Sequence, residues 1–349
     1  MVEVLRTYGH QLADKSFDDA RELVSYMGAV QGQDLDMCKW AVGMRLKQPS
    51  LSHVREAMDS GRVVRTHILR PTWHLVSAED VRWMLQTCGK RLRTAFMTSW
   101  GKHYGVDEKI YSRCCDSATG VLSGTDGLTM QELTAELNLS GLGWNVDQVK
   151  TMLCLGEAEG LICNGREKGR QHTYTLLEER VPATPGISRE EAVSRLALKY
   201  FRSHSPASLE DFMWWSGMSA TEARQAVGSI QNDLITDRYE GQKLYVHRSG
   251  IKDGVPDEEA HLIPPYDEYL ISYKDRTHVL DAKYSSKAHN NYGIFQPVIF
   301  YKGKIVGNWK KVTKKGGIEI ETAFFTKAVT PGKKKIQAAI DRYKDFLKG

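Results

Sequence analysis

The sequence lacks a long apolar run. Nowhere in its 349 residues do about 18 consecutive apolar side chains occur, the length that a membrane-spanning helix needs. The first residues, MVEVLRTYGHQLADK, also lack the basic stretch followed by an apolar stretch that marks a secretory signal. Apolar residues make up 41 % and charged residues 26 %, as in ordinary globular proteins, which excludes a disordered, collagenous or membrane protein. We therefore expect a cytoplasmic protein, associated with the nucleoid if its partner is DNA.

Paired cysteines and the common catalytic motifs are also lacking. The six cysteines include no C-x-x-C pair, so we expect free thiols and no structural zinc site. The motifs G-x-S-x-G, H-E-x-x-H, G-x-G-x-x-G and the Walker loop do not occur. The eleven histidines are scattered, with no pair at i and i+4 on one expected helix. The sequence thus predicts neither a metal nor a cofactor.

Positive charge is concentrated in one segment. Residues 302–349 contain 13 lysines and arginines against 4 acidic residues, a net charge of +9, whereas the rest of the chain has a net charge of −4. A concentrated basic surface favours a polyanionic partner, usually nucleic acid. The alternative is a solvated lysine-rich surface, and charge alone does not decide between the two.

One order of elements is expected three times: a capped helix, a turn, a second helix and a hairpin. In the first copy, helices over residues 17–28, 36–46 and 50–61 precede a hairpin over 62–76, with Asp36 expected to cap the second helix. Thr129 and Asn145 open the two helices of the second copy, before a hairpin over 161–177. Ser208 and Ser219 do so in the third copy, before a hairpin over 234–248.

This order is typical of winged helix-turn-helix domains, in which the second helix enters a DNA groove and the hairpin contacts phosphates. After residue 258, short strands with glycine-containing turns and a final basic helix predict a different, strand-rich domain. We therefore expect an α+β fold of tandem winged-helix domains with a C-terminal antiparallel β-barrel-like domain. The expected domains are 1–106 (winged helix 1 with a linker helix), 107–183 (winged helix 2), 184–256 (winged helix 3) and 257–349 (basic, strand-rich).

Four sequence elements, in order along the chain, carry a resemblance to a known family. They are QGQD at 31–34, RPTWHLV at 70–76, PPYDEYL at 264–270 continuing to YKDR at 273–276, and GNW at 307–309. Together they resemble the winged-helix DNA glycosylases of the AlkZ/YcaQ type, bacterial enzymes that remove bulky alkylated bases and unhook interstrand crosslinks. The resemblance spans nearly the whole chain and implies that Gln31 and Gln33 carry the chemistry. The family's hairpin commonly reads Arg-Gly-Thr, whereas position 71 is proline here.

Two glutamines suit the removal of a base that is already cationic. Cleaving an N-glycosidic bond builds positive charge on the sugar. A glutamine cannot act as a general base at neutral pH, but its amide oxygen can hold a water molecule and face the developing cation. A base already made cationic by alkylation leaves without a general acid, so the motif implies selectivity for activated lesions. The alternative is that Gln31 and Gln33 only cap helix ends or bond loop backbone.

The candidate DNA-binding residues lie in the first hairpin and in the basic C-terminal segment: Arg65, Arg70, Trp73, His74, Lys310, Lys311, Lys314 and Lys315. Alternation along a strand turns one of Trp73 and His74 inward, so packing and DNA binding have equal weight for that pair. For Tyr266, Asp267 and Arg276 we favour an internal structural role. For the adjacent Trp214 and Trp215 we favour core packing over stacking on a base.

Two classes of function remain open at this point. The first is a DNA glycosylase that acts as a monomer without a cofactor on damaged double-stranded DNA. The second is a non-catalytic DNA-binding regulator built from the same domains. A regulator usually dimerises to bind a palindrome, and the sequence shows no dimerisation helix or heptad repeat. Release of a base from an alkylated duplex would distinguish them.

Overall fold

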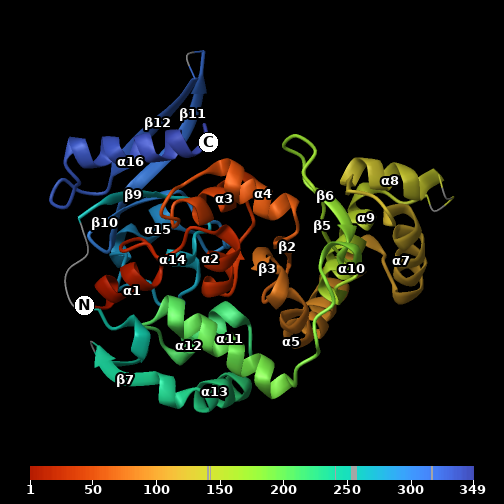
Figure 1. The fold of residues 1–349 in the computed structure, drawn as a ribbon, viewed down its shortest axis with the longest axis horizontal. Coiled ribbons are helices and arrows are strands. Elements are labelled where there is room, and N and C mark those ends of the chain that lie inside the picture. Colours follow the sequence, from red (N-terminus) through yellow and green to blue (C-terminus); the bar gives the residue numbers. More distant parts are fainter. Residues whose placement is uncertain (140, 142, 240, 253–257, 316) are drawn as a thin grey trace. The chain divides into compact units, whose positions relative to one another are not determined.

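The chain forms two compact units in a computed structural model that describes every residue except 140, 142, 240, 253–257 and 316 (Figure 1). The first unit combines Met1–Arg55 with Val193–Gly349, and the inserted unit is Glu56–Ala192. The division at residues 55 and 56 falls within the range expected for the first winged helix. The expected domain limits at 106 and 183 stay predictions, and the limit at 256 lies outside the described residues.

The inserted unit is mainly helical, with two small antiparallel sheets. The hairpin strands β2 and β3 pair as expected, with a register that runs from Val63 opposite Ser77 to His67 opposite Trp73. A three-stranded sheet has the order β4-β6-β5. The elements that begin in this unit are β2 (Val63–His67), β3 (Trp73–Ser77), α5 (Ala78–Phe96), the π-helical turn Met97–Gly101, α6 (Lys102–Tyr104), α7 (Glu108–Leu122), β4 (Leu128–Thr129), α8 (Met130–Leu139), α9 (Val146–Glu159), β5 (Ile162–Asn164), β6 (Thr173–Leu176), α10 (Leu177–Arg180) and the start of α11 (Arg189–His204).

The first unit contains the N-terminal helices, the third helix pair with its hairpin, and the C-terminal sheet. Its N-terminal elements are α1 (Val2–Gly9), α2 (Ala20–Met27), β1 (Val30–Gln31), α3 (Leu35–Gly43) and most of α4 (Leu51–Asp59). After α11 come α12 (Leu209–Ser216), α13 (Ala220–Ser229), β7 (Leu234–Tyr239), β8 (Gln242–His247), β9 (Ala260–Ile263), α14 (Glu268–Ile271), α15 (Ser285–Ala288), β10 (Val298–Tyr301), β11 (Lys304–Lys314), β12 (Gly317–Phe324) and α16 (Lys333–Phe346), with 3₁₀ turns at Gln231–Asp233, Arg248–Gly250 and Ala282–Tyr284.

The expected helix starts are confirmed, with one correction. Capping side chains accept a hydrogen bond from the backbone N–H three residues on at each predicted site: Thr129, Asn145, Ser208 and Ser219. The expected cap of α3 at Asp36 is wrong, because α3 begins two residues earlier and Asp34 caps it. The Asp34 carboxylate accepts from the backbone N–H groups of Asp36 and Met37 at 3.1 and 3.0 Å.

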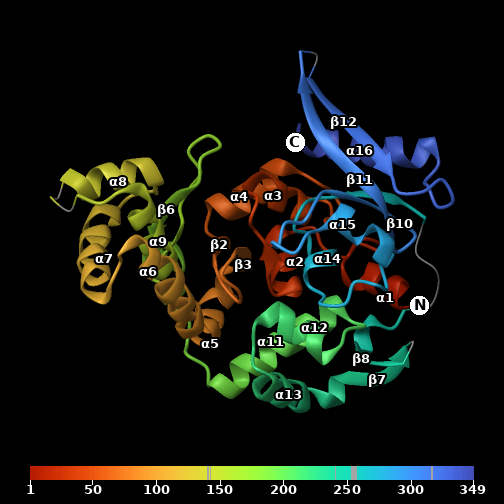
Figure 2. The same cartoon turned by 180° about the vertical axis from the view of Figure 1, so that it is seen from behind.

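The C-terminal segment forms an open sheet where a barrel-like domain was expected. Its four strands are antiparallel in the order β12-β11-β10-β9, and no pairing among the described strands joins β12 back to β9. The helix α16 lies along this sheet (Figure 2). Tyr343 of α16 packs against Trp309 of β11 with ring centroids 5.1 Å apart. Four strands are too few to close on themselves, and α16 packs against one face of the sheet instead.

The helix–helix–hairpin order is present at all three expected places, as α3, α4 with β2–β3, α8, α9 with β5–β6, and α12, α13 with β7–β8. That these groups are winged helices stays a prediction. Across the part of the chain that the structure describes, every helix is too short or too polar to cross a membrane.

Candidate active site

The segment from Gln31 to Asp34 links the end of a strand to the start of a helix. Gln31 is the last residue of β1, and Gln33 lies in the bend before α3. Asp34 fixes the far end of this bend, because it satisfies two backbone donors of the first turn of α3. The two glutamines differ in exposure: Gln31 is buried, with 4 % of its surface accessible, whereas Gln33 is exposed. Gln33 is therefore the one whose amide solvent reaches directly.

A buried carboxylate fixes the near end of the segment. The peptide N–H of Gln31 donates to Oε1 of Glu268, the first residue of α14, at 2.6 Å. Oε2 of Glu268 accepts from the indole of Trp215 at 3.1 Å and from the hydroxyl of Ser272. Nε2 of His204 lies 3.6 Å from the same oxygen. Burial lowers the pKa of His204, and its contact with Glu268 opposes that shift.

The neighbouring residue Asp267 holds the chain just beyond α3. Its two carboxylate oxygens accept from Arg45 at 2.8 and 2.7 Å, and both side chains are buried. Arg45 also donates to the backbone oxygens of His10 and Ala41. The internal role favoured for Asp267 is thus found, with Arg45 as its partner. Sequence reasoning assigned no role to Glu268 or Arg45, although two adjacent carboxylates inside an apolar stretch were a signal that both needed buried partners.

The candidate residues of the first hairpin are packed within the inserted unit. Arg65 has 4 % of its surface accessible, and its guanidinium lies over the Trp73 ring, 4.6 Å from the centroid. Trp73 donates its indole N–H to Glu157 at 3.3 Å. His74 is the inward member of its pair: it is fully buried, and Nδ1 donates to the backbone oxygen of Thr72 at 3.0 Å. Arg70 is half-buried at the start of the turn. The DNA-binding role of these residues stays a prediction.

The candidate lysines follow the hairpin of β11 and β12. Lys310, Lys314 and Lys315 are exposed, and Lys311 is half-buried. Two of the four face carboxylates of the opposite strand, Lys310 with Glu321 at 3.0 Å and Lys314 with Glu319 at 2.6 Å. The hairpin therefore presents a mixed-charge surface rather than a purely basic one, and part of the excess charge counted in the sequence is offset locally.

Comparison with known proteins places this geometry in a family. The sequence profile described as DNA glycosylase AlkZ-like matches residues 24–346. The chain belongs to this family. Among solved structures, Streptomyces sahachiroi DNA glycosylase AlkZ superimposes with a TM-score of 0.80 at 21 % identity, over 99 % of this chain and 95 % of that one. That likeness shows a shared mixed α/β fold. A search of curated proteins found no match.

Membership of the AlkZ-like family confirms the resemblance seen in the sequence. It supports the interpretation of this protein as a DNA glycosylase. The structure brings two of the four resembling elements together in the first unit, since PPYDEYL supplies the carboxylate that holds the first glutamine of QGQD. The tryptophan of GNW is structural, because Trp309 is buried and donates to the backbone oxygen of Ile263 at 2.8 Å. The roles of Gln31 and Gln33 in this AlkZ-like chain are untested and stay predictions.

Of the two adjacent tryptophans of this AlkZ-like chain, only one is core. Trp215 is fully buried, as expected, whereas Trp214 is 43 % exposed and the expectation for it was wrong. The indole N–H of Trp214 donates to the backbone oxygen of Ile271 at 2.8 Å, and the Arg276 guanidinium lies 5.6 Å from its ring. Neighbouring side chains on a helix point about 100° apart, so α12 buries Trp215 while Trp214 remains exposed.

One group of possible metal ligands occurs among the described residues. His67, Cys154 and Glu157 lie together, buried, in the inserted unit. Glu157 accepts from Nδ1 of His67 and from the indole of Trp73, while Sγ of Cys154 lies 4.0 Å from Nε2 of His67. The carboxylate is already used by two donors, and it joins the facing residues His67 and Trp73 of β2 and β3 to α9. We interpret this group as a hydrogen-bonded support of the hairpin.

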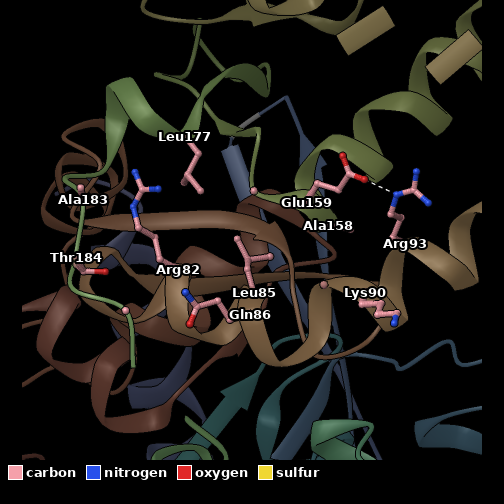
Figure 3. A pocket seen from close by; sticks show the side chains of 13 residues that line it. Arg82, Leu85, Gln86, Lys90, Arg93, Ala158, Glu159, Leu177, Ala183 and Thr184 are labelled. Atoms are coloured by element: carbon pink, nitrogen blue, oxygen red, sulfur yellow. Dashed lines mark hydrogen bonds and ion pairs between the residues drawn. The ribbon is translucent and has the colours of Figure 1, made fainter. Parts of the chain in front are cut away.

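A hollow of about 790 Å³ lies in the inserted unit between α5, the end of α9 and the segment after α10 (Figure 3). Its arginines have internal partners. Arg82 donates to the backbone oxygen of Val181 at 2.7 Å, and Arg93 pairs with Glu159 and with Glu108. None of the predicted site residues lines this hollow. Its size alone therefore does not make it the reaction site.

Proposed function

We propose that this protein is a DNA glycosylase that hydrolyses the N-glycosidic bond of bulky or crosslinked cationic alkylated bases in double-stranded DNA. The observation that carries the proposal is the exposed Gln33 in a bend anchored on both sides, in a chain of the AlkZ-like family. A fixed amide is worth more to a reaction than a mobile one, because its dipole needs no reorganisation as charge develops.

The chemistry proposed for the glutamines requires no cofactor. As the bond to a cationic base lengthens, the sugar becomes oxocarbenium-like. The amide oxygen of Gln33 accepts a hydrogen bond from the attacking water, and the negative end of the amide dipole faces the sugar. Gln31 supports Gln33 in this role. The base leaves neutral, so no proton has to be supplied to it, and the proton that the attacking water loses passes to solvent. A normal base is a much poorer leaving group, and two neutral amides do not compensate for that.

In this proposal, DNA is held by phosphate contacts rather than by sequence. The exposed lysines of the β11–β12 hairpin contribute, and the tandem winged helices form a clamp around the duplex. Binding is then weakly sequence-specific and strongly salt-dependent, because each neutralised phosphate releases counterions. We further propose that the protein works as a monomer on the nucleoid.

The test is incubation with a duplex that contains 7-methylguanine or 3-methyladenine, followed by chromatography of the released bases. The same duplex without alkylation is the control. Release from the alkylated duplex alone supports the proposal. Tight binding to one undamaged sequence without release of any base would instead support a DNA-binding regulator.

A further inference from the structure

Two neighbouring carboxylates, Asp267 and Glu268, hold the chain on both sides of α3. Asp267 binds Arg45, two residues beyond the end of the helix, and Glu268 binds the peptide nitrogen of Gln31, four residues before its start. The side chains of all three charged residues are buried. Since Asp267 also caps α14 by accepting from the backbone of Tyr269 at 2.9 Å, the position of the two carboxylates is itself fixed.

The groups around Glu268 identify what it does there. A peptide N–H, an indole N–H and a hydroxyl donate to its two oxygens, and these donors come from Gln31, Trp215 and Ser272. The peptide and indole N–H groups can only donate, so both oxygens of Glu268 act as acceptors, which a carboxylate provides and a neutral amide does not. Oε1 serves Gln31, while the other donors use Oε2. The bond from the glutamine segment and the bonds from Trp215 and Ser272 thus fall on different oxygens of the carboxylate.

We propose that Glu268 is a positioning residue that holds the Gln31–Asp34 segment in the geometry required for base release. This inference rests on the proposed function. Glu268 has no accessible surface, so it acts through the backbone of Gln31 and not on the substrate. With Asp34 capping α3 at the other end, Gln33 lies between two fixed points, two residues from one and next to the other. Loosening one anchor displaces the Gln33 amide without removing it.

The informative variant is Glu268→Gln, which keeps the shape and removes the charge. An amide offers one oxygen and one NH₂ group, so in either orientation an N–H donor faces another donor, at Gln31 or at Trp215. The matched control is Ser272→Ala, which removes a donor from Oε2 and leaves the bond from Oε1 to Gln31 in place. Both variants are expected to lower the melting temperature, so stability alone does not separate them.

The first measurement is single-turnover release of 7-methylguanine from duplex DNA, with DNA affinity measured on the same duplex. Glu268→Gln is expected to lower the rate between about 10- and 100-fold, the scale on which about 1 Å of misplacement acts. Its DNA affinity is expected to stay within about twofold of wild type, because the lysine contacts to phosphate are untouched. Ser272→Ala is expected to keep the rate within about threefold. Equal rates for the two variants, corrected for folded fraction, would overturn the proposal.

The second measurement does not depend on activity. Amide hydrogen exchange of the peptide that contains residues 29–34 is expected to be about tenfold faster in Glu268→Gln than in wild type, and nearly unchanged in Ser272→Ala. Unchanged exchange in Glu268→Gln, or equal acceleration in both variants, would show that Glu268 does not anchor this segment. If exchange responds as expected while the wild type releases no base from any cationic lesion, the anchor stands and the proposed function fails.

Discussion

Glu268 accepts a hydrogen bond from the peptide nitrogen of Gln31 at 2.6 Å, across 237 positions of sequence. The donor lies in the QGQD element at 31–34 and the acceptor in the PPYDEYL element at 264–270. Neither element, taken alone, indicates that the two form a hydrogen bond. The bond joins the end of β1 to the start of α14 within the first unit. It explains why a polar bend next to a buried strand has a defined position.

Gln33→Ala is expected to reduce base release from a 7-methylguanine duplex by about two to three orders of magnitude, the scale of losing one preorganised polar group. The melting temperature is expected to stay near wild type, because Gln33 is exposed. Single-turnover chromatography and thermal unfolding are the measurements. Gln231→Ala, at another exposed glutamine of the first unit, serves as the control. A parallel loss of stability and activity in Gln33→Ala would make Gln33 structural.

Asp34→Ala is expected to lower the free energy of unfolding by about 1 kcal/mol, the usual value of an N-cap side chain. The carboxylate satisfies two backbone donors of α3, and alanine satisfies neither. Urea unfolding measures the change. Asp34→Asn keeps an acceptor and should recover most of it, and Asp36→Ala should cost only a few tenths. A larger loss of unfolding free energy in Asp36→Ala than in Asp34→Ala would show that Asp36 caps α3.

Arg45→Met is expected to destabilise the protein by about 3–5 kcal/mol, because it leaves the Asp267 carboxylate buried without its cation. The double variant Arg45→Met with Asp267→Asn should recover a substantial part, since the uncompensated charge is gone. Chemical denaturation of wild type, both single variants and the double variant gives the four unfolding free energies of a double-mutant cycle. Additive losses would show that the two side chains are not coupled.

The β11–β12 lysines are expected to contribute unequally to DNA binding. Lys315→Gln should lower the log–log salt slope of binding by about 0.9, the value for one phosphate contact. Lys310→Gln should lower it less, because Nζ of Lys310 already lies 3.0 Å from Glu321. Glu321→Gln should tighten binding for the same reason. Fluorescence anisotropy over a salt series measures all three, and identical slopes in every variant would contradict a role for this hairpin.

Acidification below pH 6.5 is expected to destabilise the protein through buried histidines. Burial lowers the pKa of His10 and His261 well below the ordinary value of 6.5. The unfolded chain therefore binds protons that the folded chain does not, and stability falls as the pH drops below 6.5. Each such histidine adds up to about 1.4 kcal/mol per pH unit to the slope. His261→Gln should reduce the slope of stability against pH by the contribution of one histidine. An unchanged slope would show that His261 titrates normally when folded.

Local elements were predictable from the sequence because they depend on neighbouring residues. The starts of α9, α12 and α13 followed from Asn145, Ser208 and Ser219, whose side chains bond backbone groups three residues away. The hairpin of β2 and β3 followed from the alternation of its side chains. The cap of α3 was misplaced by two residues because Asp34 and Asp36 both suit the position, and only the path of β1 into the bend decides between them.

The family, too, was determined by the sequence, through four short elements whose order is informative where each alone is not. Only the tertiary structure decided which of their residues act together. In that structure Asp267 pairs with Arg45, and Glu268 binds the backbone N–H of Gln31. His74 is buried, and Trp214 is exposed. The tertiary structure also left the C-terminal sheet open and set Glu319 and Glu321 against the lysines of the same hairpin. The physical reason is that buried charges need partners, and those partners come from whichever distant segments the packing of the core brings next to them.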